Sequence, residues 1–229
     1  MFDLTATDYQ AVALSVRVAL TATLLSLPGG FLAGALLSFG RFRGRALLEG
    51  LLNLPLVLPP VVVGYLLLLL LGSNGLLGGL LAKTGLRIVF TWWAAVAASL
   101  VVGFPLLVRA VRIGLEEIDP RLLQAARTLG ASRRDTLISI VLPLSGRALL
   151  AGAGLMFARS LGEFGATIVL AGNIPGLTQT IPLAIFDYIN TPGGEGRAMT
   201  LCLLSVALSL AALLGNEALL GKWAKRSRS

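Results

Sequence analysis

The sequence predicts an all-α membrane protein that crosses the bilayer about five times. Hydrophobic residues fill 56% of the 229 positions and charged residues only 13%, whereas soluble domains carry about 25% charged residues. The mean hydropathy is +0.86, and apolar stretches long enough for a ~30 Å hydrocarbon core recur along the chain. The net charge of +8 at pH 7 comes mainly from residues between these stretches, so we attribute it to membrane topology and expect no nucleic-acid partner.

We expect one transmembrane domain over residues 1–229. Its five spans are predicted at about 11–39, 47–71, 89–108, 144–170 and 198–220. Positive residues gather after the first, third and fifth spans, and such residues favour the cytoplasmic side. The amino terminus is therefore expected outside and the carboxyl terminus inside.

The second span contains several residues that interrupt a helix, Pro55, Pro59, Pro60 and Gly64. In lipid, the carbonyls that a proline frees must find partners or line a cavity. The span is therefore predicted to be kinked, either beside a path across the membrane or simply packed against its neighbours. Residues 72–87 follow as a Gly-rich outer loop.

The fourth span carries Arg159 and Glu163, which lie one helical turn apart and can pair on one face. Ionisable groups at this depth are candidates for function, and the alternative is a neutralising pair that fixes helix packing. Arg17 in the first span is expected to reach toward the interface, where Trp92 and Trp93 form part of an aromatic belt. A short outer helix is predicted over residues 180–189.

A polar bracket over residues 116–143 interrupts the apolar pattern between the third and fourth spans. Asp119 followed by Pro120 predicts a helix start, and Gly130 predicts its end in the left-handed conformation. Ser132 and Asp135 then form a capping box that starts a second helix. The first helix is expected to bury an apolar stripe. Its members are Ile118, Leu122, Ala126 and Leu129.

The four arginines of the bracket predict that it faces the cytoplasm. They are Arg121, Arg127, Arg133 and Arg134. From charge and periodicity alone, an amphipathic loop lying on anionic lipid remains an equal alternative.

Catalysis by this chain is not expected. It has no His, and Cys202 is its single cysteine, so the commonest general base, the commonest metal ligand and any internal disulfide are absent. The phosphate-binding pattern G-x-x-x-x-G-K-[ST] is also missing. We therefore predict no catalytic residue, no metal site and no cofactor in this chain.

The bracket sequence QAARTLGAS, followed by a short helix and Leu-Pro, resembles the EAA loop of permeases of ATP-binding-cassette (ABC) importers. In that family the loop docks into a groove on a cytosolic ATPase. Gln124 stands where the family usually has Glu, and Gly130 matches the signature glycine. The resemblance implies ATPase-coupling roles for seven residues. They are Gln124, Ala125, Ala126, Leu129, Gly130, Ala131 and Ser132.

Further stretches, NLPLVLPPVVVGYLLL and FARSLGEFGAT among them, resemble the molybdate branch of that family. The resemblance implies the type I (MetI-like) importer permease fold in a bacterial cytoplasmic membrane. It also implies a homodimer in membrane lipid, two cytosolic ATPases that bind ATP and Mg²⁺, and a periplasmic or lipid-anchored molybdate-binding protein. Tungstate would be handled alike. Sulfate, thiosulfate or phosphate transport, and a passive channel or secondary transporter, stay as alternatives.

Candidates for the pathway and its gate lie in the second and fourth spans. They are Pro59, Pro60, Gly64, Arg159, Glu163, Gly165 and Thr167. The hypothesis is that backbone dipoles and hydroxyls such as that of Thr167 line the path, with binding weak enough to permit release.

Overall fold

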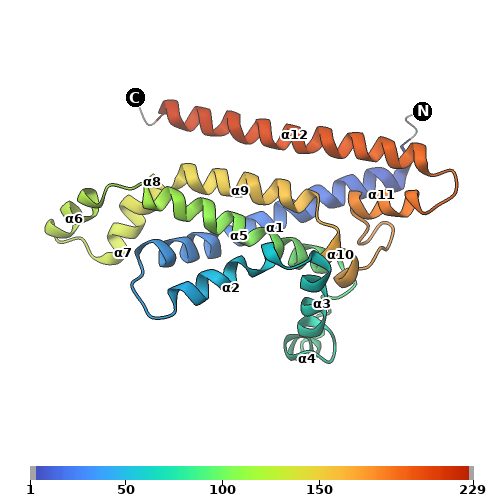
Figure 1. Ribbon diagram of the computed structural model, residues 1–229, viewed down its shortest axis with the longest axis horizontal. Coiled ribbons are helices and arrows are strands. Elements are labelled where there is room, and N and C mark those ends of the chain that lie inside the picture. The colour runs from blue at the N-terminus through green and yellow to red at the C-terminus, as the bar shows by residue number, and fades with distance from the viewer. Residues whose placement is uncertain (1–3, 227–229) are drawn as a thin grey trace.

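The long helices lie side by side along one axis of an elongated bundle (Figure 1). The computed structural model describes residues 4–226, and these contain helices and connecting segments without strands. Four long helices form the body. They are α1 (Ala6–Phe39), α5 (Trp92–Glu116), α9 (Gly146–Leu161) and α12 (Glu195–Arg226). The all-α prediction is confirmed.

Among the described residues, four segments are long and apolar enough to cross a membrane. A fifth is counted if Arg134–Leu144 and Gly146–Leu161, which meet at 63°, form one broken span. The chain is therefore a multi-pass membrane protein with four or five crossings, in agreement with the predicted number of about five.

Small residues make the core between α1, α5 and α9. Ala19, Ala22 and Ala94 are completely buried, with Leu107 and Met156 filling the space between helices. Small side chains allow helix backbones to approach closely, which matters in lipid because apolar burial gives helices little reason to associate there. The three helices thereby form the closely packed centre of the molecule.

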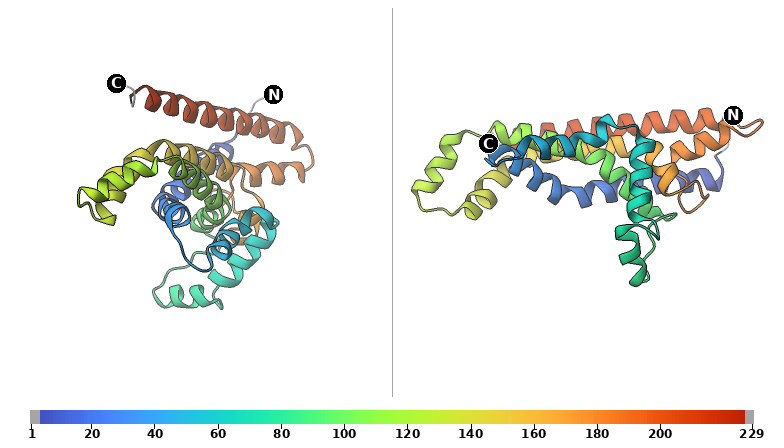
Figure 2. Two further views of the ribbon diagram at one scale, coloured as in Figure 1. Left: turned by 60° about the vertical axis from the view of Figure 1, so that its left-hand side comes forward. Right: turned by 60° about the horizontal axis from the view of Figure 1, so that its bottom comes forward.

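The predicted second span is divided into two helices. α2 (Arg45–Val57) is followed by its cap residue Leu58, and α3 (Pro60–Leu71) begins after Pro59. Two consecutive prolines lack the N–H groups that would continue the ladder of α2, whereas Pro55 is accommodated inside α2. α3 leaves the bundle sideways (Figures 1 and 2). The segment predicted as an outer loop contains a further short helix, α4 (Leu76–Lys83).

Two other spans also differ from their predicted limits. α5 continues past residue 108 to Glu116, so Arg109 and Arg112 lie within the helix instead of marking its end. The predicted span 144–170 is broken: α9 ends at Leu161, and three residues separate it from α10 (Gly165–Leu170). Gly162 and Gly165 flank this break, where glycine weakens helical continuity.

The bracket consists of α6 (Pro120–Thr128), α7 (Arg133–Thr136), the π-helical turn η1 (Leu137–Val141) and α8 (Leu142–Leu144). It lies at the same end of the bundle as the last turns of α12, whereas the start of α1 and the short helix α11 (Ile181–Ile189) lie at the other end (Figure 1). This relative arrangement agrees with the predicted topology. α11 coincides with the helix predicted over 180–189.

Candidate functional site

The bracket begins with the predicted cap. The backbone N–H of Arg121 donates to Asp119 Oδ1 at 2.8 Å, and Pro120 occupies the first helical position. These two residues fix where α6 starts, because the cap satisfies an N–H that has no partner inside the helix.

The end of α6 is a tight turn through Gly130, which has φ +86°. The N–H of Ala131 donates to the carbonyl of Ala126 and that of Gly130 to the carbonyl of Arg127, both at 3.0 Å. These two bonds form a Schellman motif, which requires a left-handed residue at the glycine position. The change of direction between the two halves of the bracket is therefore set by Gly130.

The second half starts at the predicted capping box. The backbone N–H of Asp135 donates to Ser132 Oγ at 3.2 Å, and the backbone N–H of Ser132 donates to Asp135 Oδ2 at 3.1 Å. The Ser132 hydroxyl also donates to this carboxylate, and both bonds lower the pKa of Asp135 below its usual range. With Gly130, the box holds α6 and α7 in a fixed relative orientation.

The buried side of α6 differs from the predicted stripe. Ile118 and Ala126 are buried, and Leu123 packs partly against the core. Leu122 is 49% exposed and Leu129 is 88% exposed. The prediction was right for Ile118 and Ala126 and wrong for Leu122 and Leu129. Leu129 lies beyond the end of α6 at Thr128 and so outside its helical periodicity. Leu122 lies within α6 but on its exposed side, and Leu123 takes its place against the core.

The seven predicted coupling residues lie along the second half of α6 and the turn through Gly130, and most of them are exposed. Ala126 is buried and Ala131 half-buried, whereas the other five are exposed. Leu122, Leu129 and Ile138 add large exposed apolar side chains to the bracket. Exposed arginines lie among them, so the bracket presents a mixed apolar and basic surface.

The pathway candidates from the second and fourth spans come together at one helix contact. α3 packs against α10, and a Cβ atom added to Gly64 would lie 2.8 Å from both Cα and the carbonyl oxygen of Ala166. A Cβ added to Gly165 would lie 2.7 Å from Cβ of Pro60. These approaches are closer than real Cβ contacts, so the breaks after α2 and after α9 meet only because glycine stands at both positions.

Within this contact, Thr167 is completely buried. Its hydroxyl therefore faces the interior of this chain in the structure, not an open path. Pro59 and Gly162, in contrast, are exposed beside the two breaks. The carbonyl of Pro59 is not free, because it accepts hydrogen bonds from the N–H groups of Val62 and Val63 at the start of α3.

Arg159 and Glu163 form the predicted pair, with Arg159 Nη1 2.8 Å from Glu163 Oε2. Glu163 is buried and Arg159 is 31% exposed. The other carboxylate oxygen, Oε1, accepts a hydrogen bond from the backbone N–H of Ala166 at 2.8 Å. Glu163 thus joins the end of α9 to the start of α10, and the positive charge of Arg159 is partly compensated.

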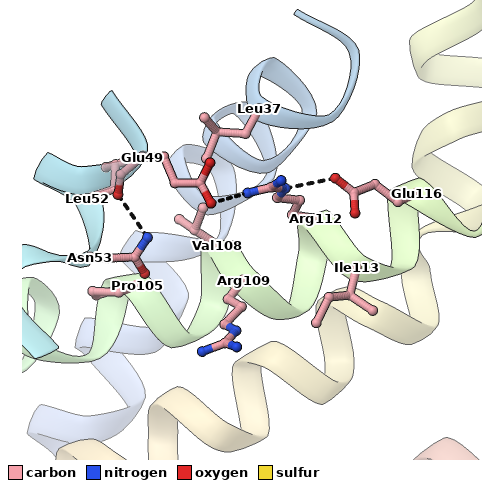
Figure 3. A pocket seen from close by; sticks show the side chains of 10 residues that line it. All are labelled: Leu37, Glu49, Leu52, Asn53, Pro105, Val108, Arg109, Arg112, Ile113 and Glu116. Carbon is pink, nitrogen blue, oxygen red and sulfur yellow. Dashed lines mark hydrogen bonds and ion pairs between the residues drawn. The ribbon is translucent and has the colours of Figure 1, made fainter. Parts of the chain in front are cut away.

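A polar pocket of about 440 Å³ lies between α1, α2 and α5 near the bracket (Figure 3). Arg112 is paired there with Glu49 of α2 and, at 2.8 Å, with Glu116. The Asn53 side chain donates to the carbonyl of Glu49 at 2.8 Å. Sequence reasoning missed this site, although a carboxylate at Glu49 in an apolar helix was a usable signal.

Side chains also connect helices at the end of the bundle opposite the bracket. The Arg17 guanidinium lies over the ring of Trp92, 4.2 Å from its centroid. The Tyr188 hydroxyl donates to Asp8 at 2.8 Å and links α11 to α1. Arg17 therefore has a packing partner inside the chain, as a cation–π contact.

The family follows from comparison with known proteins. The model of the family described as "Binding-protein-dependent transport system inner membrane component" matches residues 26–220. The chain belongs to this family. Its members are permeases, so transport is not a reaction that this chain catalyses.

Two relatives within this transport-system family show how specific the match is. The chain is 51% identical over 215 residues to the molybdenum transport system permease protein ModB of Escherichia coli (strain K12), covering 93% of this chain and 94% of ModB. It is 43% identical over 157 residues to the sulfate transport system permease protein CysT of the same strain, covering 69% of this chain and 57% of CysT.

This chain has the fold of ABC importer permeases. The structure resembles, with a TM-score of 0.71 and 16% identity, a chain in a bacterial alginate ABC transporter in complex with an alginate pentasaccharide-bound periplasmic protein. The match covers 93% of this chain and 77% of that chain. The predicted permease fold is therefore confirmed.

Proposed function

We propose that the chain is the transmembrane permease subunit of an ABC importer for molybdate, with tungstate handled alike. The observation that supports this most strongly is the 51% identity to ModB along 93% of the chain. The sulfate relative matches less of the chain at lower identity, so sulfate is the second candidate substrate. Molybdate, tungstate and sulfate are all tetrahedral dianions, which makes competition between them the natural test of substrate choice.

In this proposal the bracket faces the cytoplasm and docks on an ATPase subunit that binds ATP and Mg²⁺. The mixed surface of Leu122, Leu129 and Ile138 with neighbouring arginines suits a protein groove, because buried apolar anchors with charged surroundings are typical of interfaces. A loop that only rests on lipid would not need the Schellman turn and capping box that hold the bracket in one shape. This geometry favours the docking element over the lipid-bound loop.

In this proposal the translocation path runs beside the two helix breaks, between two copies of the chain. Discontinuous helices often border substrate pathways, and the exposed residues Pro59 and Gly162 mark the two helix breaks here. Arg159 offers a partly compensated positive charge nearby, which suits brief attraction of a dianion without tight binding. A movement of the bracket would reach this region through α5 and α9, which flank it.

A further partner is proposed at the opposite end of the bundle. A periplasmic or lipid-anchored molybdate-binding protein would deliver the anion next to α11 and the start of α1. The alginate transporter complex with its periplasmic protein is a precedent from a protein of the same fold.

The experiment is uptake of radioactive molybdate into proteoliposomes that contain the permease, its ATPase and its binding protein. The proposal predicts uptake that needs ATP, stops when the ATPase carries a substitution in its phosphate-binding lysine, and resists competition by sulfate. Uptake that persists without ATP would identify a channel or secondary transporter. Preferred transport of sulfate would identify the second candidate.

A further inference from the structure

The pocket between α1, α2 and α5 is separate from the bracket surface and from the Arg159–Glu163 pair. It lies at the bracket end of the bundle and holds about 440 Å³. Its walls carry two guanidinium groups, two carboxylates and the amide of Asn53 (Figure 3). A polar pocket next to a membrane-spanning core is a candidate for ligand binding, because it is costly to keep polar groups there without partners.

The two arginines of the pocket differ in their partners. Arg112 is held by Glu49 and by Glu116. Arg109 lies one helical turn earlier on α5 and, among the described residues, has no carboxylate within ion-pair distance. Figure 3 shows its side chain directed away from the three paired residues. The pocket therefore contains one occupied and one available guanidinium.

We propose that this pocket is a low-affinity oxyanion site at the cytoplasmic exit, in which a tetrahedral dianion binds Arg109 and competes with Glu49 for Arg112. The inference rests on the proposed function, since it assigns the last stop of the transported anion. Glu49 acts as an internal anion that holds the site closed until a dianion arrives.

The chemistry favours this exchange. A guanidinium presents a fork of donors that fits the oxygens of a tetrahedral oxyanion, and two guanidiniums three residues apart on one helix can share one dianion. Exposed arginine side chains change rotamer on the nanosecond scale, so Arg109 can swing toward an anion beside Arg112. A dianion also gains more from two positive charges than the single carboxylate of Glu49 does.

Displacing Glu49 from Arg112 also costs little free energy. The side chains of Arg112 and Glu49 are 24% and 39% exposed, and ion pairs with this much access to water are weak. Release of Glu49 therefore places its carboxylate in water without burying a charge. The internal competitor keeps the affinity for the anion low, which an exit site requires.

Occupancy of the pocket has a mechanical consequence. The Glu49–Arg112 pair joins α2 to α5 across 63 positions of sequence, and α2 leads directly to the break at Pro59. An anion that displaces Glu49 removes this link. The exit site would then loosen α2 while the anion leaves.

The test is equilibrium binding of radioactive molybdate to the purified permease–ATPase complex without its binding protein, at constant ionic strength. Arg109→Ala is expected to weaken binding by about tenfold, the usual value of a charge-assisted hydrogen bond. Arg109→Lys is expected to retain part of the affinity. Glu49→Gln is expected to tighten binding by up to about fivefold, because it removes the competitor of the anion.

The matched control is Arg41→Ala, which removes an exposed positive charge from the loop at the same end of the bundle, outside the pocket. Its affinity is expected to stay within about twofold of the wild type, since exposed charges act weakly at a distance in salt. A purely structural ion pair would not make Glu49→Gln bind molybdate more tightly. The opposite signs expected for Arg109→Ala and Glu49→Gln are thus specific to the proposal.

Unchanged affinity in Arg109→Ala, or unchanged or weaker binding in Glu49→Gln, would overturn the proposal. If Glu49→Gln does not fold, the same comparison is made with Glu49→Asp, whose shorter side chain is expected to compete less and to bind the anion more tightly. Failure of the exit site leaves ATP-driven uptake by the wild-type complex intact, whereas failure of the proposed function abolishes that uptake itself. The two failures are therefore distinguishable.

Discussion

The contact between α3 and α10 gives the sharpest structural prediction, because one methyl group should disrupt it. In Gly64→Ala, the new Cβ would lie 2.8 Å from Cα and from the carbonyl oxygen of Ala166. Both are backbone atoms, so no side-chain rotation can relieve the overlap and α3 must move away from α10. Overpacking of this kind costs about 1–3 kcal/mol.

Part of that cost is offset, since alanine is more favourable than glycine inside a helix by about 1 kcal/mol. The net expectation for Gly64→Ala is a loss of about 0–2 kcal/mol in the free energy of unfolding. Gly50→Ala in α2 is the matched control, because a Cβ there meets no atom within 4 Å. The same substitution should leave the stability unchanged or increase it at that position.

The assay is thermal unfolding of the purified complex combined with molybdate uptake in proteoliposomes. Gly64→Ala is expected to lower the unfolding midpoint and to reduce uptake, whereas Gly50→Ala should do neither. If Gly64→Ala matches Gly50→Ala in both measurements, the close approach of α3 and α10 is not part of the working protein.

Two further substitutions test local side-chain interactions. Glu163→Gln keeps an acceptor for the N–H of Ala166 but leaves Arg159 without its counter-charge. It should lower the free energy of unfolding by about 1–3 kcal/mol, which is less than the usual value for a buried pair because Arg159 is partly exposed. The control Glu217→Gln, at an exposed position, should not change stability measurably. Asp119→Ala removes the cap of α6 and should cost about 1 kcal/mol locally, seen as faster protease cleavage within the bracket; an unchanged cleavage rate would show that α6 does not depend on this cap.

Local features were predictable from sequence because their partners lie within a few residues. The Asp119 cap, the Gly130 turn, the Ser132–Asp135 box and the Arg159–Glu163 pair each close over five positions or fewer. Their geometry follows from helix periodicity and from the hydrogen bonds that helix ends require.

Features that depend on distant packing were not predictable. The contact of Gly64 with Ala166 joins positions about one hundred residues apart, and the Arg112–Glu49 pair joins positions 63 apart. The prolines predicted a kink in the second span, but the direction that α3 takes after it depends on the contact of α3 with α10. Leu129 was expected inside because periodicity does not show where a helix stops.

In the proposed function, the bracket transmits the action of an ATPase to the membrane spans. The number of molybdate ions imported per ATP hydrolysed measures this coupling directly. Gly130→Val forces a β-branched residue into φ +86°, a strain of roughly 1–3 kcal/mol that should reshape the turn. Gly44→Val is the control, because Gly44 has φ +94° in the loop before α2 and a Cβ there meets nothing within 4 Å. We predict that Gly130→Val lowers imported molybdate per ATP by about tenfold or more while Gly44→Val stays near the wild-type ratio. An unchanged ratio in Gly130→Val, with both variants assembled on the ATPase, would contradict the account.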